Sequence, residues 1–204
     1  RWTVGASYSL GRDTVNAGPS PAGTNCAGEA NGSNAQACRD WSLMLKYDSP
    51  RWGAAASHLQ LNGGTGAFAG LISANLRDKR SLLTGYAHID QLKIGAGWLR
   101  RDNDGNAATP RSDLFFVGAT YRWPQFTLDA QLSHLRPAHS ANKASLLVLR
   151  GAYHLSKRTA AYASLGHINN KGAAAYGASS AAAGGLPAPG VNQTGFGVGL
   201  RHTF

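Results

Sequence analysis

The stretch that decides the fold is the last one, Asn192-Gln193-Thr194-Gly195-Phe196-Gly197-Val198-Gly199-Leu200-Arg201-His202-Thr203-Phe204. Successive side chains of a β-strand point to opposite faces of the sheet. Counted in this way, Phe196, Val198 and Leu200 share one face, and the other face carries glycines and Arg201. The alternation predicts a strand with one apolar face and one small or polar face.

Upstream of this stretch, runs of about ten residues with the same alternation recur along the chain. They lie at residues 2–10, 41–47, 52–61, 80–89, 92–101, 113–122, 126–135, 146–155, 159–168 and 194–204. Most are close to the roughly 9–11 residues with which a tilted strand crosses a bilayer. No 3.6-residue pattern of helix length persists, so the sequence predicts an all-β protein of about ten strands.

The connections between these runs alternate between short and long. The short ones are residues 48–51, Asp90, 123–124 and 156–158, and the long ones are 11–39, 62–79, 102–112, 136–143 and 169–193. Outer-membrane barrels have short periplasmic turns and longer extracellular loops. The pattern therefore predicts a transmembrane antiparallel up-and-down β-barrel, with extracellular long loops and a periplasmic C-terminus.

Composition agrees with strands that face two environments. The chain has 204 residues and is 43% hydrophobic, yet no apolar run approaches the roughly 20 residues of a transmembrane helix. Alternation alone also fits a soluble β-sandwich that binds anionic ligands. The aromatic residues favour the membrane, because a group of them lies near the short turns, where an interfacial girdle would form. They are Tyr47, Trp52, Tyr121, Trp123, Phe126, Tyr153 and Phe204.

Three stretches resemble the trimeric general-diffusion porins of Gram-negative bacteria, in particular the neisserial and betaproteobacterial group. They are residues 152–159 followed by Tyr162 and Gly166-His167, residues 192–196, and residues 199–204. A strand ending in Leu200, His202 and the terminal Phe204 also resembles the assembly signal of outer-membrane proteins. The resemblance implies a homotrimer that contacts lipid and lipopolysaccharide and reaches the barrel-assembly machinery through its last strand.

Porins of this kind have sixteen strands, so the resemblance implies that residues 1–204 form the last ten strands of one porin-type domain that is incomplete at its N-terminus. Arg1-Trp2-Thr3-Val4-Gly5 already reads as a strand, as expected for a chain that begins inside the fold. The alternative is a complete ten-stranded barrel, whose lumen side chains would largely fill. Frequent Gly, Ala, Ser and Thr at inward positions favour a wide, wet lumen.

The charge pattern indicates what such a lumen conducts. The chain has 20 basic and 10 acidic residues, a net charge of +10, and its basic residues recur singly along the strands. On the porin interpretation the basic lumen-facing residues are Lys46, Arg80, His88, Lys93, Arg101, Arg122, Arg150 and Arg201. Asp129 is nearly the only carboxylate expected well inside a strand. Fixed positive charge lowers the barrier for anions, so we expect passive diffusion of small hydrophilic solutes with an anion preference.

Two alternatives remain for these charges and for the function. Any one basic residue can instead face solvent or lipopolysaccharide, and Arg80 and Arg101, near the outer rim, are the weakest candidates. A non-channel outer-membrane barrel is the second alternative, acting as an adhesin or structural anchor through loops 11–39 and 169–193.

Cys26 and Cys38 flank a polar segment, which suits a disulfide in an oxidising compartment, although two free thiols are the alternative. No metal site is expected: no histidine accompanies the cysteines, and Pro137 separates His134 from His139.

Nothing in the sequence supports an enzyme or a cofactor site. Most carboxylates fall in turns and loops, and no nucleophile-elbow pattern occurs. Aromatic residues and cations mostly fall on opposite strand faces, which argues against nucleic-acid binding.

Overall fold

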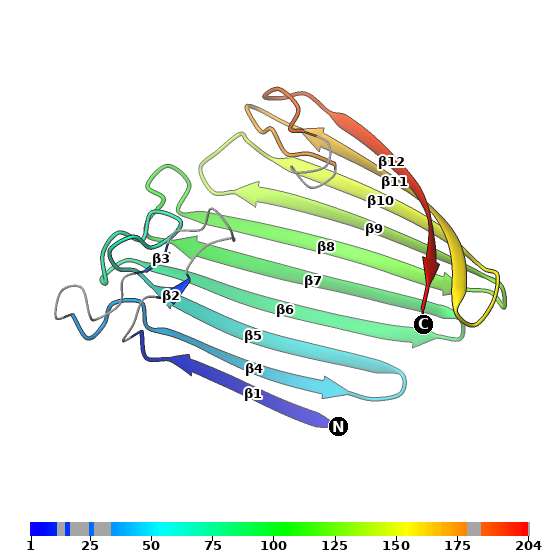
Figure 1. The fold of residues 1–204 in the computed structure, drawn as a ribbon, viewed down its shortest axis with the longest axis horizontal. Coiled ribbons are helices and arrows are strands. Elements are labelled where there is room, and N and C mark those ends of the chain that lie inside the picture. Colours follow the sequence, from blue (N-terminus) through cyan, green and yellow to red (C-terminus); the bar gives the residue numbers. More distant parts are fainter. Residues whose placement is uncertain (12–14, 17–24, 27–33, 179–184, 204) are drawn as a thin grey trace. The chain divides into compact units, whose positions relative to one another are not determined.

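The computed structural model describes residues 1–11, 15–16, 25–26, 34–178 and 185–203, and in these residues it is all-β (Figure 1). Ten strands form one sheet, in the order β1-β4-β5-β6-β7-β8-β9-β10-β11-β12, and β2 and β3 form a separate two-stranded sheet. The expected up-and-down arrangement of ten strands is confirmed. No helix among the described residues is long and apolar enough to cross a membrane.

The strands match the predicted runs closely, and the differences lie mainly at the long-loop ends. Their bounds are β1 Trp2–Ser9, β2 Val15–Asn16, β3 Asn25–Cys26, β4 Asp40–Asp48, β5 Trp52–Asn62, β6 Arg77–Ile89, β7 Leu92–Asn103, β8 Arg111–Arg122, β9 Phe126–Pro137, β10 Ala144–His154, β11 Thr159–Asn170 and β12 Gln193–His202. The expectation that residues 62–79 are all loop was wrong, because β6 begins at Arg77. Main-chain pairing continues there through charged residues that carry no apolar alternation.

Chain contacts divide the protein into two compact units. The first comprises residues 1–48, 54–83 and 99–113, and the second comprises 49–53, 84–98 and 114–204. In the first unit β1 pairs with β4 in antiparallel register from Trp2↔Tyr47 to Ser9↔Asp40. The apolar face of this pair is exposed, with Val4 at 70% and Leu43 at 51%, and the other face joins the Ser7 and Ser42 hydroxyls at 2.8 Å.

The buried core of the first unit lies in its loops. Cys26 and Cys38 form a disulfide, and both are packed with the buried Ala37 and Ala74. A Cβ atom on Gly64 would lie 2.9 Å from Cys26 Sγ, so only glycine fits against the bridge without displacement. The 11–39 connection also contains β2 and β3, which were not predicted because two-residue strands leave no periodic signal.

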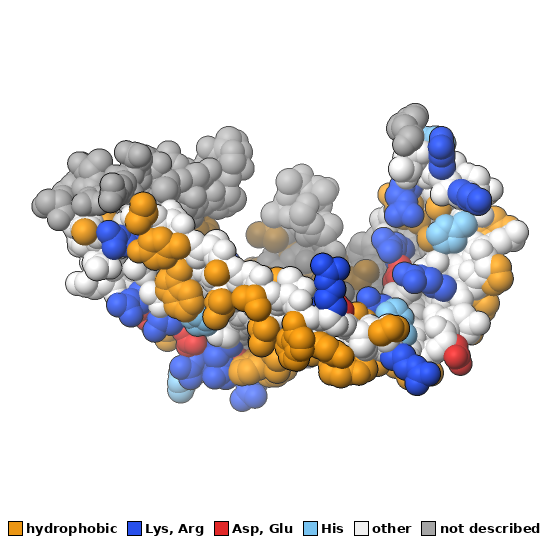
Figure 2. Space-filling model, turned by 90° about the horizontal axis from the view of Figure 1, so that it is seen from below, with side chains coloured by type: hydrophobic (Ala, Val, Ile, Leu, Met, Phe, Trp, Pro, Cys, Tyr) orange, Lys and Arg blue, Asp and Glu red, His pale blue; other side chains and the backbone are white. Residues whose placement is uncertain are grey.

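In the second unit, strands β9 to β12 form a continuous antiparallel lattice. One row across it runs through Ala130, Leu149, Leu165 and Phe196, and the next row through Asp129, Arg150, Ser164 and Gly197. Phe196 is 88% exposed, although it is a large apolar residue. One strand face is therefore apolar and exposed, while the other is polar. Figure 2 shows the hydrophobic side chains gathered in a band and the basic side chains in separate groups.

Aromatic rings cluster beside the short turns of the second unit. The Trp123 ring centroid lies 4.2 Å from that of Tyr121 and 5.6 Å from that of Phe126. The Tyr153 hydroxyl donates a hydrogen bond to Gln125 Oε1 at 3.1 Å. Asp90 makes the tight turn between β6 and β7 with a φ of 51°. Amphipathic rings at strand ends are typical of the boundary between an apolar layer and water.

Candidate functional site

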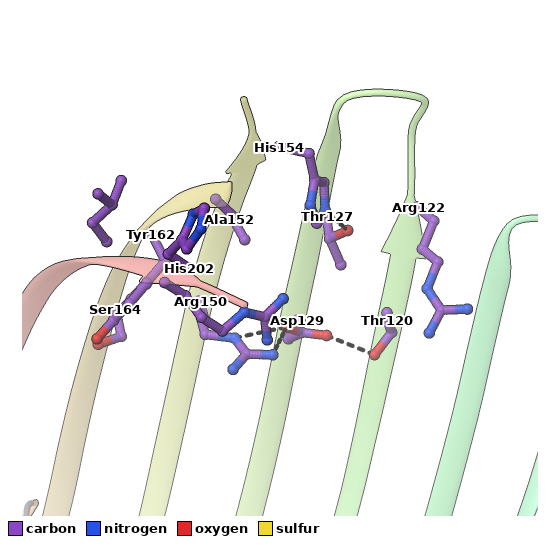
Figure 3. A pocket seen from close by; sticks show the side chains of 13 residues that line it. Thr120, Arg122, Thr127, Asp129, Arg150, Ala152, His154, Tyr162, Ser164 and His202 are labelled. Atoms are coloured by element: carbon purple, nitrogen blue, oxygen red, sulfur yellow. Dashed lines mark hydrogen bonds and ion pairs between the residues drawn. The ribbon is translucent and has the colours of Figure 1, made fainter. Parts of the chain in front are cut away.

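The candidate site is a hollow of about 860 Å³ on the polar face of the second unit (Figure 3). It lies toward the short turns, because Arg122 ends β8, Thr127 is near the start of β9, and His154 ends β10. Its principal polar side chains are Arg122, Asp129, Arg150, His154, Tyr162 and Arg201. Five strands contribute to it: β8 to β11 through alternate residues, and β12 through the consecutive residues Leu200, Arg201 and His202.

Asp129 is the anchor of this site. Its carboxylate accepts hydrogen bonds from Arg150 Nε at 2.9 Å and Nη2 at 2.6 Å, and from Thr120 Oγ1 at 2.7 Å. The three residues come from adjacent strands β8, β9 and β10, and Figure 3 shows them in one line across the sheet. The carboxylate therefore holds Arg150 in position and offsets one of the positive charges.

The other two arginines of the hollow differ from Arg150 in their partners. In the part of the chain that the structure describes, no carboxylate forms an ion pair with Arg122 or Arg201. Two histidines are held by hydroxyl groups, His154 Nε2 by Thr127 Oγ1 at 2.9 Å and His202 Nδ1 by Thr159 Oγ1 at 2.9 Å. The hollow therefore carries more fixed positive than negative charge.

A second hollow, of about 570 Å³, lies further along the same face. Lys93 borders it, with Nζ 4.3 Å above the Tyr86 ring centroid, and Arg150 borders both hollows. The His88 ring packs edge-on against Tyr86 at 5.4 Å. The expectation that cations and aromatic rings fall on opposite faces is therefore wrong for Lys93 and Tyr86, because the polar face also carries rings.

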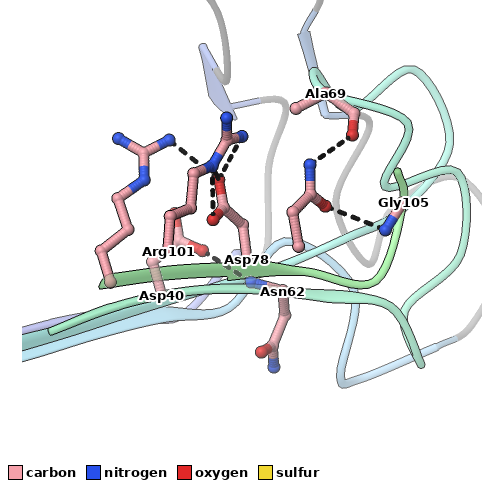
Figure 4. Close-up of polar contacts among 8 residues, drawn as sticks. Asp40, Asn62, Ala69, Asp78, Arg101 and Gly105 are labelled. Carbon is pink, nitrogen blue, oxygen red and sulfur yellow. Dashed lines mark hydrogen bonds and ion pairs between the residues drawn. The ribbon is translucent and has the colours of Figure 1, made fainter. Parts of the chain in front are cut away.

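The first unit contains a separate cluster around Asp78, which is 1% exposed (Figure 4). Its carboxylate accepts hydrogen bonds from Arg101 Nε at 2.9 Å and Nη2 at 2.7 Å, and from Arg80 Nη2 at 2.8 Å. Asp78, which was expected in a loop, is the second residue of β6, so a carboxylate also stands at the start of this strand. Arg80 and Arg101, predicted as lumen cations, share this one buried counter-charge.

Sequence reasoning missed Asp78 because the charged run Arg77-Asp78-Lys79-Arg80 reads as loop. A signal was nevertheless present: Asp78 and Arg80 are two residues apart and share a face if the strand starts early. Lys46, also predicted as a lumen cation, forms an ion pair with Asp48 at 2.7 Å between Nζ and Oδ2.

Asparagines fasten the loops beside the Asp78 cluster. Asn103 is buried, donates to the Ala69 carbonyl oxygen at 3.0 Å, and accepts from the Gly105 amide at 2.9 Å. In β4, Asp40 Oδ1 accepts a hydrogen bond from the main-chain N–H of Asn62 at 3.1 Å. These bonds fix the ends of β4, β5 and β7, and so support the strand ends that carry Asp78 and Arg101.

The remaining predicted residues are placed as follows. Leu200 is 66% exposed and borders the larger hollow, and Phe204 lies outside the described residues. His134 Nδ1 is paired with Ser145 Oγ at 2.9 Å. Among the described residues, no group of three or more His, Cys, Asp or Glu side chains is placed to hold a metal ion.

Comparison with known proteins gives the following relationships. A family model described as Gram-negative porin matches residues 1–173. An anion-selective porin from Comamonas acidovorans superimposes with a TM-score of 0.70 at 19% identity, covering 100% of this chain and 56% of that chain. OmpT of Vibrio cholerae gives a TM-score of 0.59 at 16% identity, covering 88% and 60%. No curated protein matches.

The chain is therefore shorter than the solved structures that it resembles. It spans 56% of the Comamonas porin and 60% of the Vibrio protein. A further porin structure has a TM-score of 0.56 at 10% identity, with 97% of this chain and 66% of that chain covered.

Proposed function

The chain belongs to the Gram-negative porin family and is an outer-membrane protein of the β-barrel type, and we propose that it lines a passive diffusion channel for small hydrophilic solutes with a preference for anions. The observation that carries the proposal is the polar strand face of the second unit. There Lys93, Arg122, Arg150 and Arg201 accompany one carboxylate, Asp129.

The physical argument is electrostatic. A cation fixed beside a water-filled path lowers the energy of a passing anion and raises that of a cation, most strongly where the walls exclude water. Asp129 offsets Arg150, so Lys93, Arg122 and Arg201 are the residues that set the sign of the field in this unit. The anion-selective porin from Comamonas acidovorans, which has the same fold, supports this assignment.

In the first unit we propose that the polar face contributes a weaker field. Asp78 offsets Arg80 and Arg101 in part, and Asp48 offsets Lys46. The predicted preference for anions is therefore mild, and it depends chiefly on the second unit.

Planar-bilayer recording of the full-length protein in a potassium chloride gradient tests the proposal. We expect stepwise conductance and a reversal potential that favours chloride over potassium. Absence of conductance steps would contradict the channel, whereas a reversal potential favouring potassium would contradict the anion preference alone.

A charge variant connects the recording to the site. Replacing Lys93 by Gln should shift the reversal potential toward potassium, because Lys93 has only a ring beside it and no neutralising carboxylate in the described residues. Lys157→Gln, in the exposed turn between β10 and β11, is the matched control and should leave the reversal potential unchanged.

For the assembly, we propose that residues 1–204 are the C-terminal ten strands of one larger porin-type domain. The incomplete coverage of the solved porins supports this. We further propose a homotrimer, with support from a trimer form of the similar Vibrio OmpT. The long loops would be extracellular, near lipopolysaccharide, the apolar face would meet lipid, and β12 would engage the barrel-assembly machinery.

A further inference from the structure

The floor of the larger hollow consists of small side chains. In the strand register, Ala152 on β10 faces Thr127 on one side and Tyr162 on the other. A second small residue, Ala160, lies on β11 and faces Arg201 of β12. Small residues between longer ones leave a recess with an apolar base, and the hollow occupies about 860 Å³ above it.

Tyr162 forms an aromatic wall of this recess. It faces Gly199 in the register, and a Cβ atom at Gly199 would lie 2.5 Å from its hydroxyl oxygen and 2.6 Å from its Cζ. The ring therefore lies across the neighbouring strand in space that only glycine leaves. Tyr162 is 39% exposed, and its hydroxyl has no hydrogen-bond partner among the described residues, so the ring remains available to a solute.

Two guanidinium groups stand diagonally from this ring. The two cross-strand neighbours of Tyr162 are Ala152 on β10 and Gly199 on β12. Arg150 is two residues from Ala152, and Arg201 is two residues from Gly199. Diagonal neighbours in an antiparallel sheet are about 7–8 Å apart, which long side chains span. The recess therefore combines an apolar base, an aromatic wall and cations on both flanking strands (Figure 3).

We propose that this hollow is a binding site for small aromatic carboxylates, with the aromatic ring of the solute against Tyr162 and its carboxylate on Arg150 and Arg201. A small inorganic anion uses the cations but not the wall, and a neutral aromatic molecule uses the wall but leaves the cations unsatisfied. An aromatic carboxylate uses both kinds of contact. The proposal rests on the proposed function for the route by which solutes reach the hollow.

The site is suited to weak and transient binding. The hollow is open and much larger than a benzoate ion, so water reaches both the bound solute and the side chains that hold it. A channel site must attract a solute and also release it. Arg150 borders the second hollow with Lys93, so a released anion meets another cation along the same strand face.

Saturation-transfer NMR on the full-length protein in detergent micelles, titrated with sodium benzoate, tests binding without any need for conductance. Sodium acetate supplies the charge without the ring, and benzyl alcohol supplies the ring without the charge. We expect benzoate to bind more tightly than either. Equal affinity of acetate and benzoate, or of benzyl alcohol and benzoate, would overturn the proposal.

Variants assign the binding to the residues. Arg201→Gln should weaken benzoate about tenfold, because it removes a charge-assisted hydrogen bond without breaking an ion pair of the described residues. Tyr162→Leu should weaken benzoate but not acetate, and Tyr162→Phe should retain benzoate affinity. Phe116→Leu is the matched control, because this ring borders only the second hollow and lies over Gly97.

A variant that is expected to bind benzoate more tightly distinguishes a specific effect from loss of binding through misfolding. Asp129→Asn keeps the shape and the hydrogen-bond acceptor for Arg150 but removes the competing negative charge, so benzoate should bind more tightly. Unchanged affinity in both Arg201→Gln and Tyr162→Leu would place benzoate elsewhere and overturn the proposal. Benzoate binding that follows these variants in a protein without conductance would uphold the site while the channel function fails.

Discussion

A carboxylate inside a strand changes the charge that the neighbouring arginines present. Asp78 is buried and bonded to both Arg80 and Arg101. From the sequence these two arginines were predicted as lumen cations, the weakest candidates of that set, and their counter-charge was missed because Asp78 fell in an expected loop. Strand length depends on main-chain pairing with neighbours, which side-chain periodicity reports poorly at a charged end. Asp129, within a clearly alternating strand, was placed on the polar face as expected.

Replacing Asp78 by Asn should lower the free energy of unfolding by about 1–3 kcal/mol, because two arginines lose a charged acceptor in a buried position. It should also increase the chloride preference, since both guanidinium charges become unbalanced. Urea unfolding in detergent or lipid measures the first effect, and reversal potentials measure the second.

Asp102→Asn is the matched control in the same unit. Its ion pair with Arg111 is exposed, with side chains at 35% and 52%, so the loss should stay within about 1 kcal/mol. Equal destabilisation by the two variants would contradict the role assigned to Asp78.

Glycine at position 199 is explained by the ring beside it. Gly199→Ala should lower the free energy of unfolding relative to Gly195→Ala by about 1 kcal/mol, because the added methyl displaces Tyr162. At Gly195 the added atom would meet only Ala178 Cβ at 3.9 Å, an ordinary contact. Parallel urea titrations compare the two variants, and equal stability would show that Tyr162 does not depend on Gly199.

The strands were predicted well because two patterns in the sequence indicate the same fold. One is the alternation of apolar and polar residues within each strand, and the other is the alternation of short and long connections between strands. Strands such as β9 and β12 repeat an apolar residue at every second position. Tight turns at Asp90 and Trp123 connect β6 to β7 and β8 to β9. The two-residue strands β2 and β3 carry no such repeat. The register between strands also could not be read from one sequence, and it is the register that brings Arg150 beside Asp129 and Tyr162 beside Gly199.

The assignment of the two faces can be tested on adjacent residues of β10. Leu149 lies on the apolar face with Leu165, whereas Val148 borders the second hollow. Leu149→Arg should lower the free energy of unfolding in phospholipid vesicles by about 2–4 kcal/mol, the cost of an arginine in the bilayer interior. Val148→Arg should cost much less, because its side chain reaches water. If Val148→Arg destabilised the protein more than Leu149→Arg, the assignment of the apolar and polar faces would be wrong.

Over the whole molecule, the family and the fold are more predictable from the sequence than the distribution of charge. The family and the ten-stranded sheet follow from features spread over the whole chain, so they were accessible from the sequence. The distribution of charge was not, because it depends on which cations find a carboxylate. In the first unit Asp78 and Asp48 offset cations, whereas in the second Arg122 and Arg201 have no ion pair among the described residues.

The central claim is that the polar face lines an aqueous path, and labelling two adjacent residues of β9 tests it most directly. Gln131 borders the second hollow, and Leu132 is 49% exposed on the opposite face. The described cysteines are joined in a disulfide, so a thiol introduced at either position can be addressed by itself. During bilayer recording, a charged methanethiosulfonate reagent should reduce the conductance of Gln131→Cys and leave that of Leu132→Cys unchanged. Block at Leu132→Cys with no effect at Gln131→Cys would contradict the account.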